Sequence, residues 1–227
     1  KAIGSYQDAA VEHRGPDATA SKYDEMIAAG NTTLQTQLLI HKIIIFQEQR
    51  DETPKDDTAA LEAIGSKISG VFDALGNYDL QELSDKALEA LGKNYEKQNP
   101  FRAKPYWEEL LGRPDELYHA AAVMALGRIE MNPGPGSNPD NAILRFRRII
   151  DDFATQEKYN ATEFLPEAHR NIAKVALAQK DYKTAEEILL TYFKYKKWDA
   201  GNKRNRADAM LMLGTALENN DKKDDAK

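Results

Sequence analysis

The sequence has no cysteine, which excludes disulfides, thiolate metal ligands and cysteine nucleophiles. Apolar runs such as Ile43–Phe46 are far too short to span a membrane. The four histidines are scattered, and none has a second histidine three or four residues away, as a helical metal site would need. The sequence also has no glycine-rich phosphate loop and no nucleophile elbow around a serine. It therefore predicts no catalytic residue, no metal and no cofactor.

A large excess of one charge is also missing. The net charge is −6 over 227 residues, which argues against a dedicated nucleic-acid binder. Hydrophobic residues make up 41% of the chain, enough for a packed core, so general disorder is not expected.

The ends of the sequence predict a piece of a longer or processed protein. The chain begins at Lys1 without an initiator methionine, and residues 222–227 resemble the start of another helix. A cysteine-free, processed chain would suit the bacterial periplasm or cell envelope, although a cytoplasmic fragment would have the same features.

Hydrophobic periodicity predicts an all-α chain of about twelve helices in six pairs, with no strand. The β-branched residues of 32–50 could favour a strand, but the length and interspersed polar residues of this segment favour a helix. The most turn-like segment is NPGPGSNPD at residues 132–140. The predicted helices cover residues 1–13, 19–29, 32–50, 58–75, 80–97, 105–112, 115–131, 141–153, two segments of 166–199 around a turn at 179–181, 204–220, and a new start at 222.

A large residue followed by a small one recurs on alternate predicted helices. The pairs are Leu91-Gly92, Leu126-Gly127, Ile172-Ala173 and Leu213-Gly214. The intervening helices carry a small and a large residue four apart, namely Ala103 with Trp107, Ala142 with Phe146, and Ala185 with Leu189. A glycine or alanine lets two helix backbones approach, and the large residue fills the adjacent groove. The pattern predicts repeated helix pairs that pack on one another.

This arrangement resembles the tetratricopeptide repeat family, through Leu91-Gly92 with Tyr95, Leu126-Gly127, Tyr182 with Ala185, and Leu213-Gly214. The resemblance is clearest over residues 80–227 and weaker over 1–79. The early tryptophan of the family is missing, and its positions hold Leu88, Val123, His169 and Met210. The resemblance implies a single domain over 1–227, an α-solenoid of about six antiparallel helix pairs wound as a right-handed superhelix. A HEAT-like or other α-solenoid is the alternative.

The resemblance also implies a concave groove, lined by the first helix of each pair, that binds a peptide or a partner protein. The residue after each small one is expected to face this groove, and three of these residues are cations: Lys93, Arg128 and Lys174. Three cations in register would favour an acidic partner. Further groove candidates are Lys86, Glu89, Met124, Arg170 and Asn171. The competing interpretation is a solvated helix face in a chain that is 30% charged.

Three other functions remain open at this point. A helical α/α enzyme domain with a carboxylate site would need a buried pair of acidic residues. A self-assembling module would associate through its terminal repeats. The basic and aromatic segment 192–198 could stack on bases, but packing of Tyr192 and Phe193 explains it better and argues against nucleic acid.

Overall fold

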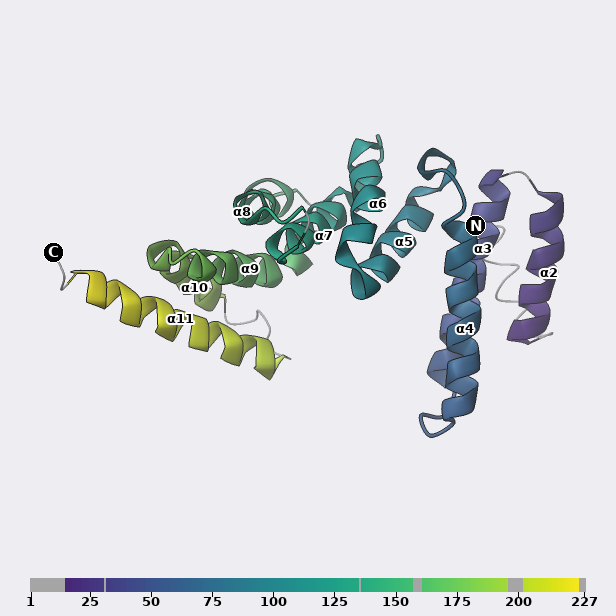
Figure 1. Ribbon diagram of the computed structural model, residues 1–227, viewed down its shortest axis with the longest axis horizontal. Helices are drawn as coiled ribbons and strands as arrows, with labels where there is room; N and C mark the ends of the chain where they lie inside the picture. Colours follow the sequence, from purple (N-terminus) through teal and green to yellow (C-terminus); the bar gives the residue numbers. More distant parts are fainter. Residues whose placement is uncertain (1–14, 31, 135, 157–160, 196–201, 225–227) are drawn as a thin grey trace. The chain divides into compact units, whose positions relative to one another are not determined.

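The computed structural model describes residues 15–30, 32–134, 136–156, 161–195 and 202–224 (Figure 1). Within these residues the chain is all-α, with ten α-helices and no strand. The helices pack mostly against their neighbours in sequence. The chain divides into two compact units, residues 1–109 and 110–227, and each unit is described by itself.

The first unit contains helices α2 to α5 and most of α6. Their bounds are Pro16–Ala29 (α2), Thr32–Glu52 (α3), Thr58–Leu75 (α4), Asp85–Gln98 (α5) and Pro100–Gly112 (α6), and α6 runs across the division. Helix α3 packs against both α2 and α4, and α5 contacts α3 and α4. Side-chain caps fix the starts of α4 and α5. The Asp57 carboxylate accepts a hydrogen bond from the backbone N–H of Ala60 at 3.1 Å, and the Ser84 hydroxyl accepts one from the backbone N–H of Ala87 at 3.3 Å.

The second unit contains helices α7 to α11. Their bounds are His119–Met131 (α7), Pro139–Arg148 (α8), Leu165–Ala178 (α9), Tyr182–Lys194 (α10) and Lys203–Asp224 (α11). A π-helical turn, Ile149–Phe153, extends α8, and short 3₁₀ turns occupy Glu116–Tyr118 and Ala161–Phe164 of this unit and Leu80–Glu82 of the first unit. Successive helices pack as α7 on α8, α8 on α9, α9 on α10 and α10 on α11.

The positions of the helices were predicted better than their ends. Helix α3 is a helix as predicted, and the turn at 179–181 is confirmed, with Asp181 accepting from the Thr184 amide at 3.2 Å. The start predicted at residue 80 was wrong, because Ser84 caps α5 and a 3₁₀ turn precedes it. The start predicted at 105 was also wrong, since α6 begins at Pro100 and contains Pro105. No new helix begins at 222, because α11 continues to Asp224.

Helix glycines accept aromatic rings of the following helix at two of the predicted crossings. A Cβ atom added to Gly92 would lie 2.6 Å from the Trp107 ring, and one added to Gly127 would lie 2.6 Å from the Phe146 ring. At the third crossing, Ala173 shares a buried cluster with Leu189. The predicted large-and-small pairs are therefore confirmed as contact positions in α5, α7 and α9. At Gly214 of α11 nothing lies within 4 Å of an added Cβ. The helix that would cross there was expected around Ala226, which lies outside the described residues, so this fourth pair stays a prediction.

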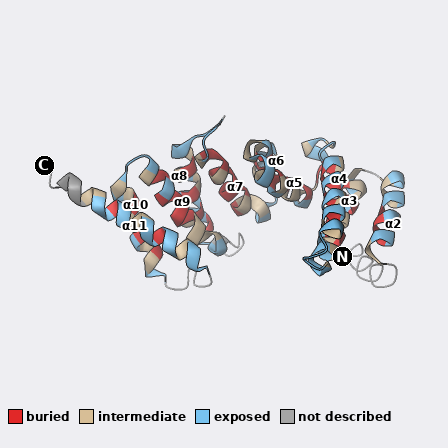
Figure 2. Cartoon of the chain, turned by 60° about the horizontal axis from the view of Figure 1, so that its bottom comes forward, coloured by how far each residue is buried: buried red, intermediate tan, exposed pale blue. Residues whose placement is uncertain are grey.

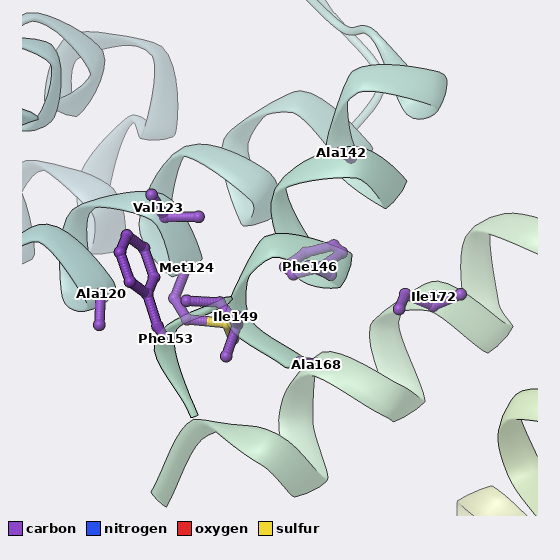
Figure 3. Packing of buried hydrophobic residues seen from close by; sticks show 9 residues of the cluster. All are labelled: Ala120, Val123, Met124, Ala142, Phe146, Ile149, Phe153, Ala168 and Ile172. Atoms are coloured by element: carbon purple, nitrogen blue, oxygen red, sulfur yellow. The ribbon is translucent and has the colours of Figure 1, made fainter. Parts of the chain in front are cut away.

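The core of the second unit joins α7, α8, the π-helical turn and α9. Met124, Phe146, Ile149 and Ile172 belong to one buried cluster (Figure 3), and none of them is accessible to solvent. Buried residues, red in Figure 2, make up most of α7 and more than half of α9. These two helices are buried on more than one face because each is packed by helices on more than one side.

The contact of Gly92 with Trp107 predicts opposite effects for two glycine substitutions in the first unit. Gly92→Ala forces a methyl group into the Trp107 ring, and overpacking of this kind costs about 1–3 kcal/mol. Gly65→Ala in α4 meets nothing within 4 Å, so it should stabilise the helix by about 1 kcal/mol through propensity alone. Chemical denaturation measures the unfolding free energy of both variants. A stabilised Gly92→Ala variant would contradict the close contact, and the added change Trp107→Phe should restore part of the loss.

Candidate functional site

The first unit has a groove of about 420 Å³ between α3, α4 and α5. Its apolar lining residues are Ile40, Ile43 and Ile44 of α3, Ile68 and Phe72 of α4, and Ala90 of α5. Its polar lining residues are Gln47, Arg50, Lys86, Glu89, Lys93, Asn94 and Lys97. On α3 the lining residues recur at three- and four-residue intervals, so they share the face of that helix toward α5. The groove size is in the range of ordinary ligand pockets.

The rim of this groove is basic. Arg50, Lys86, Lys93 and Lys97 oppose a single acidic residue, Glu89. All four cations belong to exposed residues, whereas Ile40, Ile43, Ile68 and Phe72 are buried. Lys93 forms an ion pair with Glu89 at 2.6 Å, one turn away on the same helix. The arrangement is an apolar floor with an excess of positive charge at its edge, which can accept an apolar side chain and an anionic group together.

Three of the predicted groove residues, Lys86, Glu89 and Lys93, meet at this site. Sequence reasoning missed the other half of the site, which is formed by the α3 and α4 residues and by Arg50 and Lys97. One feature of the sequence could have indicated this half of the site: α3 carries apolar residues on more faces than packing against a single helix requires.

The other two predicted cations, Arg128 and Lys174, belong to the second unit. Arg128 of α7 donates to the carboxylate of Glu167 on α9, Nη1 to Oε1, at 3.1 Å. Lys174 is exposed. Since Lys93 lies in the first unit, joint action of the three cations stays a prediction.

Three further candidates of the second unit are buried. Met124 lies in the core with none of its surface accessible. The guanidinium of Arg170 lies 6.0 Å from the centre of the Tyr192 ring, and burial lowers its pKa below the usual value. Asn171 is also buried and donates weakly to Glu167 at 3.5 Å. These side chains support the packing of α9 and have little surface with which to contact a partner.

The basic and aromatic segment is partly used in packing. Tyr192 is fully buried, and its ring meets that of Phe193 edge to face at 5.0 Å between centroids. Burial of the Tyr192 hydroxyl raises its pKa. These two rings are therefore engaged in the fold, as the packing interpretation predicts, and residues 196–201 lie outside the described residues.

A buried ion pair holds the loop between α7 and α8. Both carboxylate oxygens of Glu130, which is 3% exposed, accept from Arg145, at 2.7 and 3.0 Å. The side-chain amide of Asn141 donates to the same carboxylate at 2.7 Å, and the backbone N–H of Asn138 donates to the backbone carbonyl of Glu130 at 2.8 Å. The predicted loop at 132–140 is therefore fastened to the end of α7, and α8 begins within it at Pro139.

Removing one partner of this pair should destabilise the second unit strongly. Arg145→Ala leaves the Glu130 carboxylate buried without its main counter-ion, which typically costs about 3 kcal/mol or more. Arg147→Ala removes an exposed arginine from the same helix and should change stability by less than about 0.5 kcal/mol. Urea denaturation followed by circular dichroism compares the two variants. Equal stability of both would show that the pair contributes little.

His169 is buried in α9 and has an acid-sensitive environment. Its Nδ1 lies 2.8 Å from the Leu165 carbonyl, an acceptor, so Nδ1 carries the proton of the neutral ring. Burial lowers the pKa of His169, although the carbonyl contact and the charge of Asp151 act in the opposite direction. Burial also lowers the pKa of His41 in α3, and the nearby Lys86 contributes.

A lowered pKa in the folded state predicts that stability is lost on acidification. Both rings are neutral in the folded chain above about pH 6.5, and the unfolded chain takes up protons first as the pH falls. The unfolding free energy should therefore decrease below that pH, by at most about 1.4 kcal/mol per pH unit for each ring. His169→Gln should reduce this slope between about pH 7.5 and 5, and His41→Gln should reduce it further. If both variants kept the wild-type pH dependence of the unfolding free energy, these two histidines would not be its cause.

Among the described helices, none is both long enough and apolar enough for a membrane crossing. In the same part of the chain, no three histidine or acidic residues are grouped so that they could hold a metal ion.

Comparisons with known proteins identify no family for the chain. No protein-family model matches the sequence, no curated protein matches it, and no solved structure matches it.

Proposed function

We propose that the chain is a tetratricopeptide-like α-solenoid scaffold that binds a partner protein or peptide. The groove of the first unit is the binding site, and its ligand is an acidic amphipathic segment. The observation that carries the proposal is the combination of an apolar floor with four cations and one acid at the rim.

The repeated packing contact supports the scaffold part of the proposal. Gly92 with Trp107 and Gly127 with Phe146 are the same contact, a helix glycine covered by an aromatic ring of the next helix. Helices that pack mainly with their sequence neighbours are what an extended repeat array requires. Such arrays expose long helix faces, which are commonly used to bind partners.

The charge distribution supports an acidic ligand. The chain as a whole carries a net charge of −6, yet the groove rim has four basic residues and one acidic residue. A local excess of cations on an acidic protein attracts anionic segments and repels other copies of the basic rim. The apolar floor would hold leucine or aromatic side chains spaced three and four residues apart on a bound helix.

The one buried carboxylate among the described residues gives the rival enzyme hypothesis no support. It belongs to Glu130, and Arg145 donates to both of its oxygens. A carboxylate neutralised in this way is not available as a general base. The peptide-binding hypothesis therefore accounts for more of the described structure.

Fluorescence anisotropy with labelled helical peptides tests the proposal. The probe is an amphipathic peptide of about five turns whose polar face is glutamate and whose apolar face is leucine. Lys86→Glu/Lys93→Glu/Lys97→Glu should weaken its binding by about tenfold or more, because the rim becomes acidic. Ile44→Ala, which shortens a partly buried floor residue, should weaken binding without changing its salt dependence.

Three controls make the result specific. Lys55→Glu/Lys183→Glu/Lys194→Glu changes net charge equally at exposed lysines that do not line the groove, so it should leave binding nearly intact. Arg128→Glu/Lys174→Glu tests whether cations of the second unit take part. A peptide with glutamine in place of glutamate should bind weakly. An equal loss of affinity in the groove and control variants would show that net charge alone causes the effect. Absence of binding of the probe to the wild type would refute the acidic-ligand proposal.

A further inference from the structure

Helix α11 is apolar on two faces, but its neighbours in the described part of the chain cover only one of them. Toward α9 and α10, its residues Ala209 and Ala216 are fully buried. Ala209 shares a cluster with Leu189 and Tyr192, and Ala216 packs in a separate small cluster of alanines. A helix that carries apolar residues all round is typically buried on both sides.

The outward face of α11 carries an apolar stripe that contains a glycine. Met210, Leu211 and Leu217 are 62%, 72% and 40% exposed, and Ala207 is exposed on the same side. Gly214 lies among them with open space where its side chain would be. In α5 and α7 the corresponding space above glycine is filled by an aromatic ring of another helix. The outward face of α11 therefore has the shape of a helix-packing surface without its second helix.

We propose that this face binds the same face of a second copy of the chain, with the two α11 helices antiparallel. The charges at the two ends of the stripe favour this occupant. Exposed Lys203 and Arg204 lie at the amino end of the stripe, and exposed Glu218 lies at its carboxyl end. Two antiparallel copies place Lys203 and Arg204 of each chain beside Glu218 of the other, whereas two parallel copies would oppose like charges.

The spacing of residues fits a two-fold axis between Met210 and Leu211. In that register Lys203 lies opposite Glu218 of the partner subunit, because both are equally distant from the axis along the helix. Ala207 lies opposite Gly214 of the partner subunit, so two small residues meet and the backbones can approach closely. Met210 and Leu211 then meet their counterparts at the centre of the contact.

The proposed contact is small, which sets the expected affinity. A single pair of helices buries less surface than the roughly 1,600 Å² of a standard stable interface. We expect a reversible dimer with a dissociation constant on the order of 10 micromolar, strengthened at low salt by the two end pairs.

Sedimentation equilibrium of the full chain between about 1 and 500 micromolar tests the proposal. The wild type should pass from monomer to dimer over this range. Leu211→Glu, at the centre of the stripe, should weaken the dimer by at least about a hundredfold, because it places two carboxylates in an apolar contact. Leu144→Glu is the matched control, since Leu144 of α8 is 64% exposed and lies outside the stripe. It should dimerise as the wild type does.

Charge reversal tests the antiparallel register without altering the apolar stripe. Lys203→Glu and Glu218→Lys should each weaken the dimer several-fold, and the double variant should restore it to near the wild-type value. Circular dichroism confirms that each variant remains helical. A wild type that stays monomeric throughout the range would overturn the proposal. A dimer that survives Leu211→Glu, or a double variant weaker than both single ones, would overturn it equally.

Discussion

The contact of a helix glycine with an aromatic ring of the next helix sets the spacing on which the rest of the packing depends. Gly92 and Gly127 accept Trp107 and Phe146 at distances that no Cβ atom would allow. Because the backbones approach so closely, the large residues before the glycines, Leu91 and Leu126, are also fully buried. A single small residue thus fixes where two helices cross, and the surrounding apolar residues only need to fill the volume that remains.

This constraint is local enough to be visible in the sequence. Helix segments were predictable from periodicity, and their caps from Asp57 and Asp181, because each depends on residues within a few positions. Helix ends at residues 80 and 105 were mispredicted because an apolar or proline residue does not by itself show where hydrogen bonding begins. Gly214 shows the limit of the pattern, since a glycine can permit a close crossing but cannot supply the second helix.

The candidate site depends on long-range geometry, and only half of it was predictable. Lys86, Glu89 and Lys93 share one helix, so their spacing placed them together. Arg50 and the isoleucines of α3 join them only because α5 contacts α3 and α4, which is not encoded in any single helix. Met124 and Arg170 were expected at a surface and are buried instead. Helical periodicity assigns residues to a face but does not indicate how many neighbours will cover it.

The arginines that support packing in the second unit differ from the lysines around the groove of the first unit, and this difference locates the proposed recognition. In the second unit Arg145 neutralises the buried Glu130, Arg128 pairs with Glu167, and Arg170 lies against Tyr192. These guanidinium groups stabilise the packing of α7, α8 and α9, and a partner could recruit them only by breaking existing contacts. The rim lysines of the first unit lie on exposed residues around an apolar floor, where a ligand can bind them without disrupting the fold. Charge recognition is therefore best placed in the groove of the first unit, and apolar association on the outward face of α11.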